Sequence, residues 1–282
     1  MTRDAFGNPV ILAPHRAERP DVIGSDAHVC PFCRGREAMT PPSIVEVGRP
    51  WRLRVFANKY PASEQHEVIV EAPDDATTFD LLPPDDAAAA VQLYADRYAA
   101  LASIDDVQYV SVFKNHGARA GASIAHIHSQ VIGIPFVPPR VEREAAVFAS
   151  GCPICSDDAG IVIAQTEAFR WVVPSVAPFA YQQWIVPKRH AAEMTSGVVA
   201  GELASLLQAS ARAMARLGDG AFNWMFMNFP NAPQGHWYVD IVPRTAAMAG
   251  FELSTGTMIN TIDPAAAARW LADGAARHPS TR

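Results

Sequence analysis

The chain has 282 residues, of which 49% are hydrophobic and 18% are charged, an ordinary composition for a folded globular protein. This length fits one large domain or two domains of ~140 residues. The formal net charge of -6 argues against a nucleic acid as the main partner, because binding a phosphate backbone needs a basic face. A small anionic substrate stays open, since a few clustered arginines can bind phosphate in an acidic protein.

The sequence pattern gives no sign of a membrane segment. The N-terminus has no apolar stretch of the kind that forms a signal peptide. No stretch elsewhere reaches the ~20 consecutive apolar residues of a membrane-spanning helix. We therefore expect a cytoplasmic protein without a membrane partner.

Four cysteines occur as two pairs with the same spacing, Cys-Pro-Phe-Cys at residues 30–33 and Cys-Pro-Ile-Cys at residues 152–155. Two residues between cysteines is the spacing of a zinc knuckle, in which both thiolates bind one metal ion. A redox pair of the thioredoxin type and a pair of inert thiols are the alternatives. Two copies of the motif, each followed by histidines, favour zinc.

The second pair starts 152 − 30 = 122 residues after the first, and similar segments follow each pair. The first half has extended segments at 54–61 and 66–70, an alanine-rich helix at about 84–103, and β-rich segments at 108–115 and 126–133. The second half repeats this order at 170–178, 183–186, about 196–217, 223–228 and 236–242. A last helix is predicted with Asp263 as its N-cap and Pro264 in its first turn.

This alternation of strands and helices predicts an α+β fold built on antiparallel sheets. We expect two tandem repeats, residues 1–140 and 141–282, which pack against each other as an intramolecular pseudo-dimer. Residues 135–152 would form the connection between them.

The most specific motif is His-Ile-His-Ser-Gln at residues 126–130. Because side chains alternate along a strand, His126, His128 and Gln130 would share one face at intervals of ~7 Å. Burying three polar side chains in an apolar strand costs free energy unless each has a partner. A solvent-facing row on a half-buried sheet is the alternative to a functional site.

These motifs resemble those of the galactose-1-phosphate uridylyltransferase family, the transferase branch of the histidine-triad superfamily. The resemblance rests on the histidine motif at 126–130, the Gly-x-Ser at 121–123 and the first cysteine pair. It extends along the chain through segments 14–20, 54–61, 113–115 and 250–256. The resemblance implies histidine-triad-like repeats, of which the first carries the active site. The chain also resembles relatives of the plant ADP-glucose phosphorylase type.

The resemblance implies that His128 is a nucleophile that attacks the α-phosphorus of a nucleotide sugar. Neutral imidazole is abundant near pH 7 and needs no separate base, so it suits this task. Gln130 replaces the third histidine of the hydrolytic members, and a neutral amide can bind phosphoryl oxygens without activating water. Ser123 is expected to act with His128 and Gln130 as the third catalytic residue.

Further residues match family positions that bind the substrate. Asn58 matches the loop that holds the nucleoside, and the others match positions close to the phosphates or the acceptor: Arg16, Arg19, Asn115, Gly121, Phe251, Thr255 and Gly256. For Arg16 and Arg19, a solvated face is the alternative. The family's acceptor lysine and glutamine positions hold Ala246 and Met258, whereas residues 254–257 could form an anion nest.

The resemblance also implies two zinc sites. The first would use Cys30, Cys33 and His126, with Asp75 or its neighbour Asp74 as the fourth ligand. The alternative is a weakened or lost site, with His116 or His66 as outside substitutes for that carboxylate. The second has a complete set of ligands, listed in chain order as Cys152, Cys155, His190 and His236. A buried histidine with ordinary hydrogen bonds is the alternative for each of the last two.

In the second half, Tyr238 aligns with His128 and Asp240 with Gln130, so this half has no nucleophile and one active site is expected per chain. Our first hypothesis is nucleotidyl transfer from a nucleotide sugar to a sugar 1-phosphate. The second is a nucleotide-sugar phosphorylase that uses inorganic phosphate or another oxyanion. The third is a non-catalytic, zinc-bearing nucleotide-binding protein. Family members are commonly dimers, so we expect either a homodimer or a pseudo-dimer within one chain.

Overall fold

The computed structural model describes residues 2–18, 29–75, 77–156, 159–195 and 197–276. Its strands are β1 (Thr2–Arg3), β2 (Pro9–Val10), β3 (Ser43–Val47), β4 (Leu53–Ala57), β5 (Gln65–Val70), β6 (Tyr109–His116), β7 (His128–Ile134), β8 (Gly160–Gln165), β9 (Phe169–Pro174), β10 (Gln183–Pro187), β11 (Phe222–Met227) and β12 (Tyr238–Pro243). Its α-helices are α1 (Pro84–Ala102), α2 (Pro139–Phe148), α3 (Ala200–Met214), α4 (Gly250–Thr255) and α5 (Pro264–Ala276). Short 3-10 helices are η1 (Pro14–Glu18), η2 (Glu37–Met39), η3 (Phe79–Leu81) and η4 (Ala118–Ala120).

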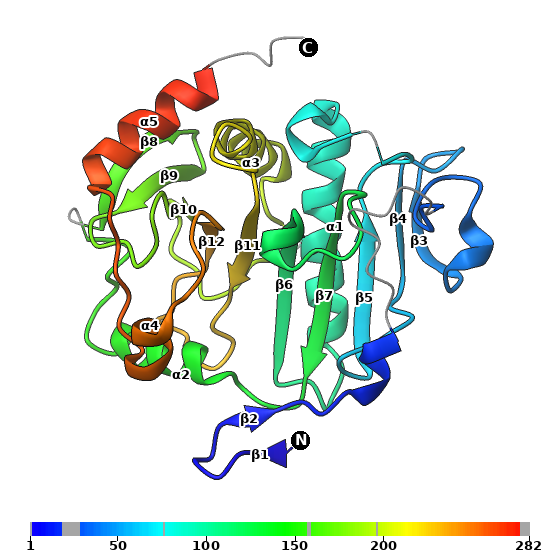
Figure 1. Cartoon of the computed structure of the whole chain (residues 1–282), viewed down its shortest axis with the longest axis horizontal. Helices are drawn as coiled ribbons and strands as arrows, with labels where there is room; N and C mark the ends of the chain where they lie inside the picture. The colour runs from blue at the N-terminus through cyan, green and yellow to red at the C-terminus, as the bar shows by residue number, and fades with distance from the viewer. Residues whose placement is uncertain (1, 19–28, 76, 157–158, 196, 277–282) are drawn as a thin grey trace.

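Among the described residues, ten strands form one continuous antiparallel sheet, which confirms the α+β prediction (Figure 1). Its order is β3-β4-β5-β7-β6-β11-β12-β10-β9-β8. Read from its outer edge, the first half has the order β3-β4-β5-β7-β6 and the second half has the equivalent order β8-β9-β10-β12-β11. The two halves join where β6 pairs with β11. The two halves therefore share a single sheet, while β1 and β2 pair as a separate hairpin.

One face of this sheet is covered by α1, α3 and α5, which lie side by side in Figure 1. Their apolar sides and the sheet form the largest core cluster, with Trp171, Tyr94 and Trp224 fully buried. The last helix begins as predicted, because the backbone N–H of Ala266 donates to the Asp263 carboxylate over 2.9 Å. No described helix is long and apolar enough to cross a membrane.

The strand that carries the histidine motif begins two residues later than predicted. It starts at His128, so His126 lies outside the ladder, and β12 likewise starts at Tyr238 rather than at His236. The rings of His126 and His236 are held by backbone carbonyl groups of Ala72 and Pro187. These contacts turn the two histidines towards the cysteine pairs instead of placing them on a strand face.

The connection between the halves contains a helix that the sequence analysis did not predict. This helix, α2, lies on the face opposite α1 and α3, over the second half of the sheet. Val141 and Phe148 are its buried residues, and the Phe148 ring packs on Phe229 with centroids 4.9 Å apart. The corresponding face of the first half has no such helix among the described residues, so it stays open to a cavity.

A buried ionic network lies directly behind the histidine motif. Lys114 on β6 donates to the Glu71 carboxylate and, over 3.0 Å, to the carbonyl oxygen of His128. Glu71 also accepts hydrogen bonds from Tyr94 and Ser129. Burial lowers the pKa of Lys114 and the Glu71 charge opposes this change. The network ties β6, β7 and α1 together where His128 begins its strand.

Replacing Lys114 with methionine should lower the free energy of unfolding by ~3–5 kcal/mol, because it leaves a buried carboxylate without its cation. Urea denaturation measures the change. Adding Glu71→Gln to this variant should restore part of the loss, since the uncompensated charge is then gone. An unchanged unfolding midpoint in Lys114→Met would contradict the importance of the pair.

Candidate active site and metal groups

His128 is held with one ring nitrogen bound and the other open. Its Nδ1 lies 2.8 Å from the carbonyl oxygen of His126, and a carbonyl can only accept, so Nδ1 carries the proton. Nε2 therefore keeps its lone pair. Burial lowers the pKa of His128 to about 4, which keeps the ring neutral at physiological pH. The edge-to-face contact with the ring of Phe32, at 5.2 Å between centroids, fixes the ring plane.

His128 lines a cavity of ≈ 250 Å³ on the open face of the first half. Its walls come from the loop of the first cysteine pair, from β4, β5 and β7, and from the turn before β7. The lining residues are Val29, Pro31, Phe32, Met39, Thr40, Pro41, Phe56, Asn58, Lys59, Tyr60, Val68, Gly121, Ala122, Ser123, Ile124, His128 and Gln130. The structure thus brings the predicted residues Asn58, Gly121, Ser123 and Gln130 together with His128. Gly121, with φ of +83°, makes the left-handed turn that leads to Ser123.

Gln130 lies two residues beyond His128, on the same face of β7 and 6% exposed. Its Oε1 lies 3.0 Å from Nε2 of His66 on β5. Asn58 approaches the same ring, with its Nδ2 3.1 Å from His66 Nε2, and its Oδ1 accepts from the Tyr60 backbone N–H. His66 therefore lies behind the cavity residues Asn58 and Gln130, and it is not part of the first metal group.

Asn115 and Arg16 border the cavity without lining it. The β6–β7 register pairs Phe113 with Gln130, and its continuation places Asn115 opposite His128. The Asn115 amide is bound to Asn223 of the second half over 2.7 Å. Arg16, in η1, donates to the carbonyl oxygen of Tyr60, which is a cavity residue. Arg19 falls outside the described residues.

The predicted acceptor residues lie elsewhere. Phe251 and Thr255 are exposed on α4, and Gly256 ends that helix in the left-handed conformation. The backbone N–H of Gly256 donates to Glu252, and that of Thr257 donates to the Thr255 hydroxyl. The anion nest stays a prediction that these hydrogen bonds do not favour, because they occupy two of its N–H groups and a helix C-terminus is the negative pole.

The first cysteine pair meets one histidine. Sγ of Cys30 and Cys33 lie 3.4 Å and 3.6 Å from Nδ1 of His126. The Asp75 carboxylate does not join these three donor atoms, and its side chain is exposed. Its backbone N–H nonetheless bonds Cys33. Asp75 and Asp74 as fourth ligands stay predictions. His116 is not a substitute, because it stacks on Phe222.

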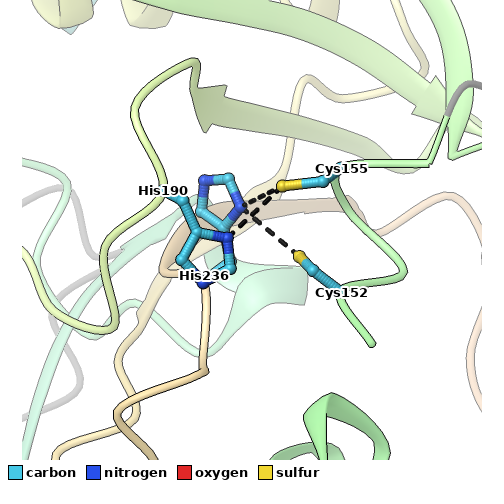
Figure 2. A group of neighbouring side chains, drawn as sticks. All are labelled: Cys152, Cys155, His190 and His236. Carbon is cyan, nitrogen blue, oxygen red and sulfur yellow. Dashed lines mark hydrogen bonds between the residues drawn. The ribbon is translucent and has the colours of Figure 1, made fainter. Parts of the chain in front are cut away.

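The second pair meets two histidines, as Figure 2 shows. Sγ of Cys155 lies 3.4 Å from Nδ1 of His190 and 3.3 Å from Nδ1 of His236, and Sγ of Cys152 lies 3.5 Å from the latter. Bonds of ~2.3 Å to sulfur and ~2.0 Å to nitrogen at a tetrahedral centre separate the two donor atoms by roughly 3.5 Å. The donor set and spacing fit zinc.

The histidines of both groups are also in the correct tautomer for a metal. Each turns Nε2 to a backbone carbonyl oxygen, at 2.8 Å for His126, 3.1 Å for His190 and 2.9 Å for His236. Nε2 must then carry the proton, so the lone pair of Nδ1 faces the thiols. Burial raises the pKa of Cys33 to about 12 and of Cys155 to about 11, so a bound metal must displace their protons.

Helix α2 covers the equivalent place in the second half, which we call the closed half, and leaves a smaller cavity of ≈ 190 Å³ beside Tyr238. Trp184 pairs with Asp240 in the second half as Val68 pairs with Gln130 in the first. The strand registers therefore agree with the sequence alignment of Asp240 with Gln130. There Tyr238 donates to Glu144, and Asp240 accepts from Arg140 over 2.6 Å, both partners lying on α2. A hydroxyl and a bound carboxylate stand where the first half has His128 and Gln130.

Some features of the site carried little sequence signal. Phe32 sits inside the first cysteine motif, and the wall formed by residues 39–41 is a loop of ordinary composition. Lys114 and Glu71 read as surface charges in sequence, although their side chains are 1% and 0% exposed. His66 did give a sequence signal, because it is an isolated histidine at the start of an apolar strand.

Comparison with known proteins places this geometry in a family. A model described as the N-terminal domain of a domain of unknown function (DUF4931) matches residues 14–137. ADP-glucose phosphorylase of Arabidopsis thaliana is 30% identical, over 90% of this chain and 87% of that protein. Galactose-1-phosphate uridylyltransferase of Thermotoga maritima is 28% identical, over 93% of this chain and 94% of that protein. The chain belongs to the galactose-1-phosphate uridylyltransferase family.

The family assignment made from the motifs is thereby confirmed. Within the galactose-1-phosphate uridylyltransferase family, the crystal structure of Arabidopsis ADP-glucose phosphorylase with bound ADP-glucose matches this chain with a TM-score of 0.81. The two are 30% identical, and the match covers 93% of each chain. The similarity therefore extends over both halves of the sheet.

Zinc analysis of the purified protein should find about two ions per chain, because the second group has four donors at zinc spacing and the first has three, to which Asp75 would add the fourth. Cys152→Ser should lose one ion and lower the melting temperature, and Cys33→Ser should lose the other. Ser150→Ala, on the loop before the second pair, is the control and should keep both. About one ion in the native protein, unchanged by Cys33→Ser, would exclude the first group as a zinc site.

Proposed function

We propose that the protein transfers a nucleoside monophosphate from a nucleotide sugar to a phosphate-bearing acceptor through a covalent nucleotidyl-histidine on His128. One observation carries this proposal: a neutral, fixed imidazole with an open Nε2 lines a cavity that also contains the predicted substrate residues Asn58 and Gly121. The named relatives are a uridylyltransferase and a nucleotide-sugar phosphorylase, and both names describe nucleotidyl transfer.

In the first step, Nε2 of His128 forms a bond to the α-phosphorus while the bond to the sugar-phosphate oxygen breaks. The sugar 1-phosphate leaves with the electron pair. In the second step, an acceptor oxygen attacks the same phosphorus and the P–N bond breaks, which restores neutral imidazole. Two successive displacements of this kind produce ping-pong kinetics.

The surrounding residues have separate tasks in this scheme. The Gln130 amide, the Ser123 hydroxyl and the Asn115 amide donate hydrogen bonds to phosphoryl oxygens as charge develops there. The apolar walls with Phe32 and Phe56 bury the base, and Asn58 and Gly121 border the nucleoside. Arg16 attracts the diphosphate from beside Tyr60, and Arg19, which is close to it in the sequence, adds a second positive charge.

Water must be kept from the intermediate for transfer to prevail. Gln130 has no basic atom with which to activate a water molecule, unlike a third histidine. Ala122 and Ile124 add apolar surface beside His128. Both features favour an acceptor that brings its own phosphate oxygen.

Zinc bound by the two cysteine–histidine groups would hold the structure together rather than take part in the reaction. Cys30, Cys33 and His126 would connect the cavity loop to the motif, and Asp75 would complete this site. The four ligands of the second group would hold the loops of the closed half. We further propose tandem repeats at 1–140 and 141–282 that form a pseudo-dimer, which the equal strand orders support. A homodimer stays a prediction.

The phosphorylase reaction is the second candidate, in which inorganic phosphate is the acceptor. Ala246 and Met258 at the acceptor positions offer no charge to a sugar phosphate, and α4 holds Thr255 and Gly256 away from the cavity. A small oxyanion needs fewer contacts than a hexose phosphate. The identity with ADP-glucose phosphorylase also favours this candidate.

Incubation with UDP-glucose or ADP-glucose labelled in the α-phosphate should leave acid-labile label on the native chain and none on His128→Ala. Label that persists in the variant excludes His128 as the nucleophile. His15→Ala, which removes an exposed histidine bound to the Pro61 carbonyl, is the control and should keep the label. Binding of the nucleotide sugar without any label would favour the non-catalytic protein.

A chase of the labelled chain then identifies the acceptor. Release of label by inorganic phosphate as a nucleoside diphosphate indicates the phosphorylase reaction. Release only by galactose 1-phosphate indicates the uridylyltransferase reaction. Release in buffer at the same rate as with either acceptor would contradict both, because the enzyme would then be a hydrolase.

A further inference from the structure

Two amide side chains flank His128, and each has its carbonyl oxygen bound by a neighbour. Gln130 is next on the same face of β7, and Asn115 lies on the same face of β6 as Phe113, the strand partner of Gln130. An amide has two ends of nearly equal shape, of which one donates and the other accepts. The hydrogen bonds around it decide which end faces the cavity.

For Gln130, the deciding group is a backbone N–H. The N–H of Ala62 points at Nδ1 of His66 over 2.9 Å, so Nδ1 must accept and the neutral ring carries its proton on Nε2. That proton can only go to an acceptor, which is Oε1 of Gln130 at 3.0 Å. Asn58 Nδ2, at 3.1 Å, cannot donate to a protonated nitrogen and is a neighbour rather than a partner. The N–H groups of Gln130 are left for the cavity.

For Asn115, the deciding group is a backbone carbonyl. Nδ2 of Asn223 lies 2.9 Å from the carbonyl oxygen of Ala120, which can only accept, so this end of Asn223 is the amide nitrogen. The same nitrogen lies 2.7 Å from Oδ1 of Asn115. Asn115 therefore accepts with its oxygen and keeps its own N–H groups free to point away from the second half.

We propose that His66 and Asn223 are positioning residues that fix the amides of Gln130 and Asn115 with their N–H groups towards the phosphoryl group on His128. This inference rests on the proposed nucleotidyl transfer. A flipped amide would present its oxygen to the charged phosphoryl oxygens and repel them. Because the neighbours already fix the N–H groups towards the phosphoryl group, the amides need not rotate during the reaction. The second half thereby supplies one residue, Asn223, to the site of the first.

The closed half contains a matched pair that serves as the control. The register places Gln182 where the first half has His66, and its Nε2 donates to Oδ1 of Asp240 over 2.7 Å. Gln182 is 3% exposed, as is His66. A variant at Gln182 breaks the same kind of buried hydrogen bond without reaching His128. It separates loss of packing from loss of positioning.

The rate of nucleotidyl-enzyme formation in a single turnover tests the first arm. His66→Phe should slow it about tenfold, the effect of losing one hydrogen bond, and His66→Gln, which keeps an N–H near Nε2, should restore most of the rate. In a Gln130→Ala background, His66→Phe should have little further effect. Gln182→Leu should leave the rate unchanged. Equal loss from His66→Phe in both backgrounds, or an equal loss from Gln182→Leu, overturns the proposal.

A second measurement does not depend on the reaction. In ¹⁵N nuclear magnetic resonance spectra of the native protein, His66 should be protonated at Nε2 and bare at Nδ1. A proton on Nδ1 overturns the positioning role even where labelling of His128 succeeds. Absence of label with the expected His66 tautomer instead refutes the proposed function and leaves this geometry standing, so the two failures are distinct.

Asn223 is tested in the same way. Asn223→Asp cannot donate, so Asn115 should turn its N–H groups to the new carboxylate and its oxygen to the phosphoryl group. The rate should fall about tenfold or more, and the effect should vanish in an Asn115→Ala background. Asn223→Ser, which keeps one donor, should lose less. An additive loss in the double variant overturns this arm.

Discussion

The hydrogen bond from His128 Nδ1 to the carbonyl oxygen of His126 decides which nitrogen of the imidazole is open. It joins two residues that lie two positions apart, so both ends must be held for it to persist. The first cysteine–histidine group holds one end through the His126 ring, and the buried Lys114 holds the other through the His128 carbonyl. The orientation of His128 thus depends on a cysteine–histidine group and on a buried ion pair.

The two halves use one plan for different purposes. In each, a histidine just before the last strand faces a cysteine pair and binds a backbone carbonyl with its far nitrogen. The first half leaves the adjoining sheet face open as a cavity, whereas α2 covers this face in the second half and binds Tyr238 and Asp240. The helix α2 is amphipathic. Its charged residues Arg140 and Glu144 bind the polar side chains of β12, which would otherwise be buried without partners.

Sequence patterns could predict much of this arrangement. The apolar spacing of α1, the cap at Asp263 and the alternating strands are local signals, and the second cysteine–histidine group follows from matched spacing. Other features depend on contacts that no local pattern encodes. The Lys114–Glu71 pair looks like two surface charges until the fold buries it. Helix α2 lies in a segment that the sequence analysis treated only as a connection. His126 left the strand because its ring contacts outweighed its backbone propensity.

The seam between β6 and β11 has a consequence for how the chain could have been assembled. Each half ends at an inner strand that pairs on one side within its own half, and the backbone N–H and C=O groups on its other side pair with the other half. A single half would expose that edge as a template for any extended chain, including its own copy. In the fused chain the complementary edge belongs to the same molecule. Pairing of the two edges is therefore intramolecular and does not depend on protein concentration. The cost is that neither half is free to evolve as an autonomous unit.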